Sequence, residues 1–245
     1  MRVALFVPCY IDQFYPNVAI ATLQLLERLG VDVIYPANQT CCGQPMANAG
    51  FEHTAQETSE LFIKNFHDCD FIVSPSGSCV LHVKHHLHSR LRVTDAEEVR
   101  GKVYELAEFL TDILTVKQIN ARFPHTVGLH QSCHGQRGLM LSQMSEIVAP
   151  PFSKTENLLN MVDGLKLVTL TRKDECCGFG GTFCVTEEAV SVKMGVDRID
   201  DHLSHGVEFI TGNDMSCLMH LEGILRRRKS NVKVAHVAEI LNASL

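Results

Sequence analysis

The chain contains the tripeptide Cys-Cys-Gly twice, and each copy lies inside a longer pattern of four cysteines. In the first pattern, 31 residues separate a single upstream cysteine from the pair and 36 separate the pair from a single downstream cysteine; in the second pattern the numbers are 42 and 39. The two sets are Cys9, Cys41, Cys42 and Cys79, and Cys133, Cys176, Cys177 and Cys217. This similar spacing predicts that the fold brings each set of four cysteines together.

Short apolar runs alternate with stretches of helical period along the 245 residues. We expect strands over 2–8, 31–35, 71–73, 126–130, 165–170 and 207–211, and helices over 15–29, 51–66, 80–91, 98–114, 136–147, 187–203, 216–228 and 234–241. Regular alternation of strand and helix favours parallel sheets covered by helices. The predicted fold class is therefore α/β.

The second half of the chain repeats the first. The last cysteine of each set begins a Cys-x-x-His motif, ending at His82 in one half and at His220 in the other. Residues 106–110 resemble residues 237–241. A repeated unit explains these matches together. We therefore predict two pseudo-repeated, three-layer α/β units with mainly parallel sheets, a first cysteine-rich domain over 1–120 and a second over 121–245.

In both halves, the cysteines follow predicted strands, the adjacent pair after a short loop. Cys9, the Cys41-Cys42 pair and Cys79 follow the first, second and third strand of the first half, and the second set has the same order. Loops that follow parallel strands emerge at one edge of the sheet, where open α/β sheets bind their ligands. Buried cysteines that only fill space have no reason to follow strands in both halves. We therefore predict that each set converges at the carboxyl edge of its sheet.

Charge and hydropathy limit the partners and the compartment. The formal net charge of −6 argues against nucleic acid as a partner. No apolar run approaches the ~20 residues needed to span a bilayer, and residues 2–7 form a strand-like run too short for the core of a signal peptide. We expect a cytoplasmic protein without a membrane span, in a compartment where thiols stay reduced.

Four converging thiolates in a reducing compartment can hold zinc or an iron–sulfur cluster. Structural zinc usually takes cysteines separated by about two to four residues, so that two sulfurs can approach one ion. Adjacent cysteines tend to point apart and are better suited to different metals of a larger cluster. We therefore favour iron–sulfur over zinc. A disulfide within the adjacent pair ranks third, because its small ring is strained.

Other residues near the cysteines are candidates for cofactor binding. Glycines let backbone N–H groups approach a cofactor closely, and the candidates are Gly43, Gly178, Gly180 and Gly181. His82 and His220 are metal ligands, hydrogen-bond donors, or partly buried histidines without a metal bond, and His134 is a weaker candidate. Cys69 and Cys184 have no counterparts in the other half, and we expect them to be structural.

The motifs resemble the cysteine-rich CCG domain, which occurs in the catalytic subunit of heterodisulfide reductase and in iron–sulfur subunits of glycolate and lactate oxidation systems. The resemblance is carried by residues 7–10, 41–45, 75–79 and 176–181. With two such domains at this length and no ferredoxin segment, the chain is similar to the lactate-utilisation protein A family, also called the L-lactate dehydrogenase complex iron–sulfur subunit. One departure is that Ser76 and Asp214 replace the first cysteine of the family's C-x-x-C.

The resemblance implies an electron-transfer subunit that works with ferredoxin-like and other subunits to oxidise L-lactate to pyruvate, and hence an oxidoreductase component. With four cysteines per domain, one 4Fe-4S cluster in each domain is the simplest expectation, and zinc is the alternative or a substitute in purified protein. Two other functions stay open: a zinc-stapled scaffold or interaction subunit, and a heterodisulfide-reductase-like thiol/disulfide oxidoreductase. The residues themselves assign no catalytic group and no lactate pocket.

Overall fold

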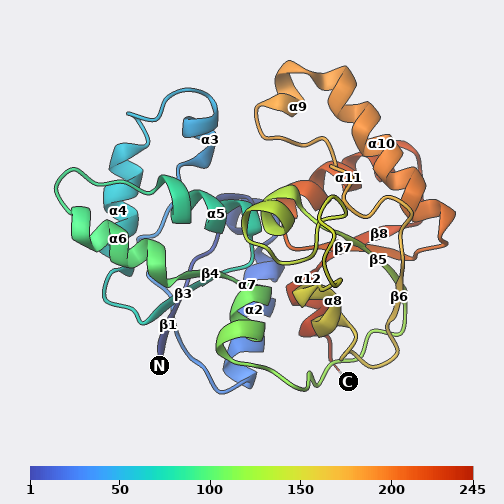
Figure 1. Cartoon of the computed structure of the whole chain (residues 1–245), viewed down its shortest axis with the longest axis horizontal. Helices are drawn as coiled ribbons and strands as arrows, with labels where there is room; N and C mark the ends of the chain where they lie inside the picture. Colours follow the sequence, from blue (N-terminus) through green and yellow to red (C-terminus); the bar gives the residue numbers. More distant parts are fainter. Residues whose placement is uncertain (245) are drawn as a thin grey trace.

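The computed structural model describes residues 1–244 and contains two four-stranded sheets. The strand orders are β2-β1-β3-β4 and β6-β5-β7-β8, and all neighbouring strands are parallel. Figure 1 shows the first half of the chain, blue to green, beside the second half, yellow to red, with helices around both sheets. The two halves share one topology, which confirms the predicted α/β fold. The domain boundary at residue 120 stays a prediction.

In the first half, short strands alternate with helices as the sequence predicts. The strands are β1 (Arg2–Leu5), β2 (Asp32–Ile34), β3 (Phe71–Ser74) and β4 (Val103–Glu105). The helices are α1 (Cys9–Phe14), α2 (Pro16–Arg28), α3 (Gln44–Asn48), α4 (Gln56–Phe66), α5 (Gly77–His86), α6 (Val93–Lys102) and α7 (Leu106–Glu108), which continues as a π-helical turn η1 (Phe109–Ile113). Helix α2 begins with Pro16, whose missing N–H costs nothing at a helix start.

The second half follows the same order of strands. The strands are β5 (Thr126–His130), β6 (Lys166–Val168), β7 (Phe209–Gly212) and β8 (Lys233–His236). The helical segments are the π-helical turn η2 (His134–Gly138) and the helices α8 (Lys154–Leu159), α9 (Phe183–Thr186), α10 (Glu188–Ser204), α11 (Met215–Arg227) and α12 (Val237–Leu241). Among residues 1–244, we find no helix that combines the length and the apolar character needed to cross a membrane.

Two segments expected to be wholly helical contain strands. Residues 98–114 comprise the end of α6, strand β4 and the start of a new helix, and residues 234–241 begin in β8. Both strands pass directly into a helix through a capping box: Glu105 and Glu108 exchange side-chain-to-backbone bonds at α7, as do His236 and Glu239 at α12. No turn residue separates strand from helix. The apolar residues of each segment therefore follow a helical period in the sequence, and the strand is not recognised.

The prediction of a helix over 136–147 is wrong. The chain makes one turn, η2, and then an irregular segment up to α8. The side chain of Gln136 donates hydrogen bonds to the carbonyl oxygen of Gln143 at 3.0 Å and to Asp174 at 2.5 Å, which stabilises the irregular path. Gly138 packs so closely on Leu81 of the first half that a Cβ would lie 2.3 Å from its Cδ2. Contacts between the halves therefore override the local helical pattern.

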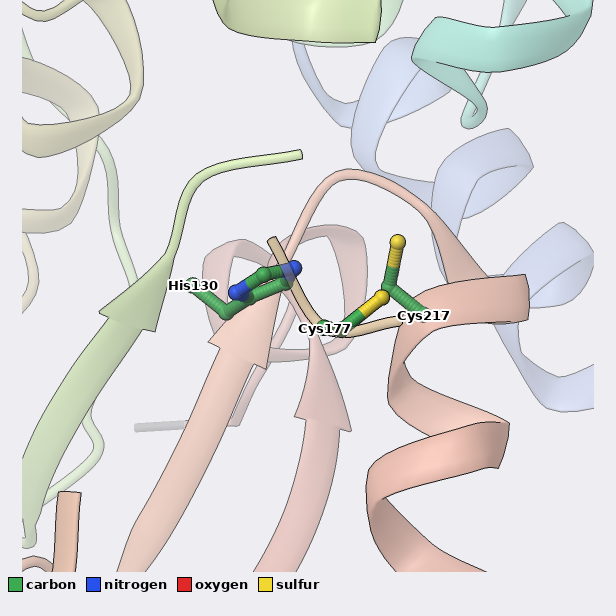
Figure 2. A group of neighbouring side chains, drawn as sticks. All are labelled: His130, Cys177 and Cys217. Carbon is green, nitrogen blue, oxygen red and sulfur yellow. The ribbon is translucent and has the colours of Figure 1, made fainter. Parts of the chain in front are cut away.

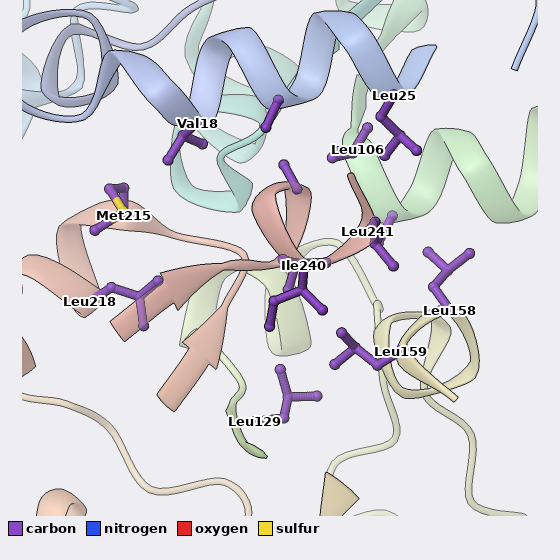
Figure 3. Packing of buried hydrophobic residues seen from close by; sticks show 14 of the residues in the cluster. Val18, Leu25, Leu106, Leu129, Leu158, Leu159, Met215, Leu218, Ile240 and Leu241 are labelled. Atoms are coloured by element: carbon purple, nitrogen blue, oxygen red, sulfur yellow. The ribbon is translucent and has the colours of Figure 1, made fainter. Parts of the chain in front are cut away.

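One apolar core includes side chains from both halves. Helix α2 packs against α12, and α7 packs against α8. Figure 3 shows Leu25 and Leu106 of the first half close to Leu241 and Leu158 of the second, and all four side chains are buried. Because non-polar burial is the main stabilising term in folding, the halves are joined by a shared core as well as by the chain between them.

We expect Leu241→Ala to lower the free energy of unfolding by about 2–5 kcal/mol, because it leaves a cavity among fully buried neighbours. Urea unfolding followed by circular dichroism measures this change. The control is Leu91→Ala, since Leu91 is 89% exposed and its loss should change stability by no more than about 0.5 kcal/mol. Equal stability of the two variants would show that the shared core contributes nothing.

Candidate metal centre

All six cysteine positions lie beyond the carboxyl ends of strands. Cys9 is the first residue of α1 and follows β1 after three residues, and Cys79 lies in the first turn of α5, after β3. The Cys41-Cys42 pair lies in the loop between β2 and α3. The second half repeats this arrangement, with Cys133 after β5, the pair after β6 and Cys217 in the first turn of α11.

The four thiols of the first set form a continuous group. The Sγ atoms of Cys9 and Cys41 are 3.8 Å apart. Cys42 lies close enough to Cys41 and Cys79 for their thiols to raise its pKa. The backbone N–H of Gly43 donates to the Sγ of Cys41 at 3.4 Å. Thiols that the sequence separates by 31 and 36 residues are therefore in direct contact.

The second set has the same pattern of contacts. Cys176 lies close enough to Cys133 and Cys177 for their thiols to lower its pKa, and the thiol of Cys217 helps to raise the pKa of Cys177. The N–H of Gly178 donates to the Sγ of Cys176 at 3.4 Å, and the N–H of Phe179 donates to the Sγ of Cys177 at 3.5 Å. Backbone N–H groups that point at sulfur stabilise negative charge there, as an anionic metal–thiolate group requires.

One thiol of each set has a pKa well below its ordinary value. The pKa of Cys41 is lowered chiefly by the hydrogen bond with Cys42, and the pKa of Cys176 is lowered chiefly by the bond with Cys133. The N–H of the following glycine adds to both effects. The thiolate is the form that ligates metals, so these lowered pKa values favour metal binding at each set.

The two sets face a single cavity. Its volume is 320 Å³, and seven of the eight cysteines line it: Cys9, Cys42, Cys79, Cys133, Cys176, Cys177 and Cys217. Helix α1 packs against α11, and α5 packs against η2, so the segments that carry the single cysteines of the two halves meet in pairs. Tyr10 and Phe179 also line the cavity, and their rings meet edge to face at 5.9 Å. The sequence predicts two separate centres; the fold places them around one common space.

Asp214 connects the two sets across this cavity. Its Oδ1 accepts hydrogen bonds from the Oγ of Ser76 and from both the N–H and the Oγ of Ser78, each at 2.9 Å. Gly77 lies so close that a Cβ there would be 3.1 Å from the other oxygen, Oδ2. The two positions where the CCG pattern has a further cysteine therefore form a hydrogen-bonded contact between the halves.

The predicted glycines occupy the turns beside the cysteine pairs. Gly43 and Gly178 have φ of +91° and +87°, a left-handed conformation that other residues adopt only with strain. A Cβ on Gly178 would lie 2.6 Å from the carbonyl oxygen of Ser191. Gly180 and Gly181 line the cavity itself. Both Cys-Cys-Gly turns thus depend on glycine for their shape.

The histidines after the last cysteine of each set lie at the edge of the sites. Burial lowers the pKa of His82 to about 4, and its ring stacks on His86 at 5.3 Å. The Nε2 of His220 is hydrogen-bonded to the carbonyl oxygen of Ser191 at 3.3 Å. His134 lines the cavity. Their roles toward a metal stay a prediction.

The two cysteines outside the sets are placed differently from each other. Cys69 is buried in the apolar cluster of the first half, beside α4. The thiol of Cys184 donates to the carbonyl oxygen of Gly181, one of the cavity glycines, at 3.0 Å. Neither lies among the residues that line the cavity.

His130 is a site residue that the sequence analysis missed. It ends β5, three residues before Cys133, and a polar residue at the end of a buried strand was the available signal. It lines the cavity, and one of its ring nitrogens, the Sγ of Cys177 and the Sγ of Cys217 lie within 4.8 Å of one another (Figure 2). Burial, followed by the charge of Arg198, lowers its pKa to about 3, so the ring is neutral.

The residues present fit a metal–thiolate centre in each half. Each set offers four neighbouring thiols, one with a lowered pKa, and N–H donors directed at sulfur. The eight cysteines would hold the group, which would supply one-electron redox chemistry if it contains iron and sulfide.

Comparison with known proteins gives the chain a family context. The family model described as cysteine-rich domain, CCG, matches residues 3–84 and 127–222. The chain is 38% identical over 246 residues to Lactate utilization protein A of Macrococcus caseolyticus, covering 99% of this chain and 96% of that protein. It is 38% identical over 247 residues to Lactate utilization protein A of Bacillus subtilis, covering 99% and 100%.

Among solved structures, a hypothetical protein from Helicobacter pylori superposes with a TM-score of 0.56 at 13% identity. The match covers 98% of this chain and 48% of that chain, so the present chain spans about half of that protein. At this identity, the similarity shows a shared fold alone.

Gly178→Ala should abolish metal binding at the second set, because the new Cβ meets the Ser191 carbonyl oxygen and the turn is left-handed. The matched control is Gly206→Ala, where φ is +65° but no atom lies within 4 Å of the new Cβ. The control should lose about 1–2 kcal/mol of stability and keep its metal. Metal analysis after anaerobic reconstitution tests this expectation. Equal metal content in the two variants would contradict it.

In reduced, metal-free protein, iodoacetamide should alkylate Cys41 and Cys176 first. Because their pKa values are lowered, these cysteines are thiolates at pH 6, and their reaction rates should not rise between pH 6 and 9. Cys69 is the internal comparison, since burial raises its pKa and its rate should rise with pH. Mass spectrometry of digested protein measures each site. A rate at Cys41 that increases with pH in the manner of Cys69 contradicts the assignment.

Proposed function

The chain belongs to the Lactate utilization protein A family and is built from two cysteine-rich CCG domains, and from this premise we propose that it is an electron-transfer subunit in lactate utilisation. In this proposal, each cysteine set holds one iron–sulfur cluster, most simply 4Fe-4S. The protein acts in the cytoplasm with ferredoxin-like and other subunits that together oxidise L-lactate to pyruvate. The proposed ligands are the eight cysteines of the two sets.

The observation that carries this proposal is the single cavity that both sets face. A metal that only stabilises a fold can be buried anywhere in it. An electron carrier must bring its centre close to a donor and an acceptor. Two cysteine sets on one cavity would bring the proposed centres beside each other and beside an open space, which supports transfer over a sealed structural role.

The protein's own residues prepare both sets for a negatively charged centre. Cys79 and Cys217 lie in the first turns of α5 and α11, whose N-terminal ends carry partial positive charge. The N–H groups after each Cys-Cys pair point at sulfur. The hydrogen bonds of Asp214 to Ser76 and Ser78 hold the start of α5, and with it Cys79, against the second half.

A zinc-stapled scaffold is the second candidate, and one observation favours it. His130, Cys177 and Cys217 offer three donor atoms within 4.8 Å, as a zinc site with mixed nitrogen and sulfur ligands requires. Against it, the Nδ1 of His130 accepts a hydrogen bond from Arg198, which leaves the proton on Nε2. A protonated nitrogen cannot bind zinc. The adjacent cysteines of both sets also suit a cluster better than a single ion.

Cys42→Ser and Cys177→Ser test the proposal by removing one ligand from each set in turn. After anaerobic reconstitution, each variant should lose the iron and acid-labile sulfide of one set and keep those of the other. Lactate-dependent electron transfer, assayed with the partner subunits present, should collapse in both variants, while circular dichroism shows that the fold persists.

Cys69→Ser is the matched control, since this thiol lies outside both sets and should leave metal content and electron transfer unchanged. Electron transfer that survives in a variant without its cluster contradicts the electron-transfer role. Zinc as the only metal after anaerobic reconstitution, or a fold that is lost together with the metal, supports the scaffold instead.

A further inference from the structure

The two cysteine sets are alike, but the residues behind them differ. Phe6 and His130 each lie three residues before the first cysteine of their set. The ring of Phe6 packs against Phe62 and Phe66 of α4, with centroid distances of 4.9 and 5.8 Å. His130 instead bonds to Arg198 of α10. At this position, the first set is therefore backed by hydrocarbon, and the second by an imidazole and a cation.

The bond to Arg198 determines which nitrogen of His130 carries the proton. Arg198 is fully buried, and its Nε–H donates to the Nδ1 of His130 at 3.2 Å. A neutral imidazole has a single N–H, so an accepting Nδ1 places the proton on Nε2. The Nε2 is buried and finds no hydrogen-bond partner within residues 1–244. His130 thus has an N–H donor that the protein itself leaves unused.

This donor faces the sulfurs of the second set. Figure 2 shows the imidazole ring extending from the end of β5 toward the thiols of Cys177 and Cys217. The ring nitrogen and both Sγ atoms lie within 4.8 Å of one another. Because Arg198 occupies Nδ1, the nitrogen that faces sulfur is Nε2. It can donate a hydrogen bond there, but it has no free lone pair for a metal.

A buried network holds the guanidinium in place behind His130. Arg198 donates to the carboxylate of Asp201 at 3.1 Å and to the carbonyl oxygen of Leu129 at 3.4 Å. Asp201 is also buried, and it accepts the backbone N–H of Arg172 at 3.0 Å. A satisfied buried network of this kind is rigid. The orientation of His130 is therefore fixed before any centre is assembled.

We propose that His130 tunes the second centre: its Nε2–H donates a hydrogen bond to sulfur of the cluster that the second set holds, and so makes this centre the more readily reduced of the two. The proposal rests on the function proposed above, since it assumes a cluster at each set. Hydrogen bonds to sulfur raise the reduction potential because they stabilise the more negative, reduced form. Phe6 gives the first centre no such donor.

The difference in potential favours transfer of one electron from the first centre to the second. With a cluster in each set, the one electron lost by the first centre would be gained by the second. No proton moves, because His130 keeps its Nε2–H in both states. The direction of transfer across the cavity is thus set by a residue that is not a ligand.

The test measures the potential of the second centre alone. In protein with Cys9→Ser and Cys42→Ser, only the second set can hold a cluster, and a redox titration followed by electron paramagnetic resonance gives its midpoint potential. His130→Phe copies the first half and should lower this potential. His130→Gln, whose amide can still donate, should stay closer to the parent. The control, Phe6→Leu, should leave the potential unchanged.

Iron and sulfide analysis, with circular dichroism, shows whether the cluster and the fold survive in each variant. An unchanged potential in loaded His130→Phe overturns the proposal, because no tuning then comes from the imidazole. Loss of second-set iron from folded His130→Phe also overturns it, because His130 is then a ligand.

Pulsed electron paramagnetic resonance on the unaltered protein, labelled with ¹⁵N-histidine, decides the point even where His130→Phe does not fold. Weak nitrogen coupling together with an exchangeable proton supports the donor role; strong coupling of a direct ligand, or no coupling, overturns it. Failure of the proposed function is distinguishable, since it appears as absent iron or absent lactate-dependent transfer and not as an unchanged potential.

Discussion

Parallel strand pairing determines where the cysteines of this protein lie. In each half, three strands run side by side in the same direction, so the residues that follow them emerge at one edge. Thiols separated by more than thirty residues in sequence thereby come into contact. The hydrogen bonds of the Cys-Cys-Gly turns, the helix starts at Cys79 and Cys217, and the common cavity all follow from this arrangement.

Much of the fold and of the candidate site could be predicted because both depend on local signals. The strands that precede Cys9 and Cys133 are short apolar runs, and apolar period identifies them without knowledge of the tertiary structure. Gly178 could be recognised because a tight turn after two cysteines requires a residue without a Cβ. In contrast, β4 and β8 were missed because the capping boxes at Glu105 and His236 start a helix with no intervening turn.

The remainder could not be predicted because it depends on contacts between the halves. From the sequence alone, Asp214 is only a residue that replaces a cysteine. Only the packing of α5 against the second half shows that its carboxylate accepts hydrogen bonds from Ser76 and Ser78. Likewise, the tautomer of His130 is defined only when Arg198, 68 residues away, is seen to donate to its Nδ1. The cavity cannot be predicted from the sequence of either repeat, because each half contributes only one of its walls.

The core shared by α2, α7, α8 and α12 has a consequence for the proposed electron-transfer function. Close-packed interiors resist deformation, and here the interior is common to both halves, with Leu25 and Leu241 buried in the same cluster. This shared packing opposes a hinge motion between the two sheets. Under the proposed function, such a scaffold would keep the reorganisation energy of electron transfer small and the gap between the two cysteine sets constant.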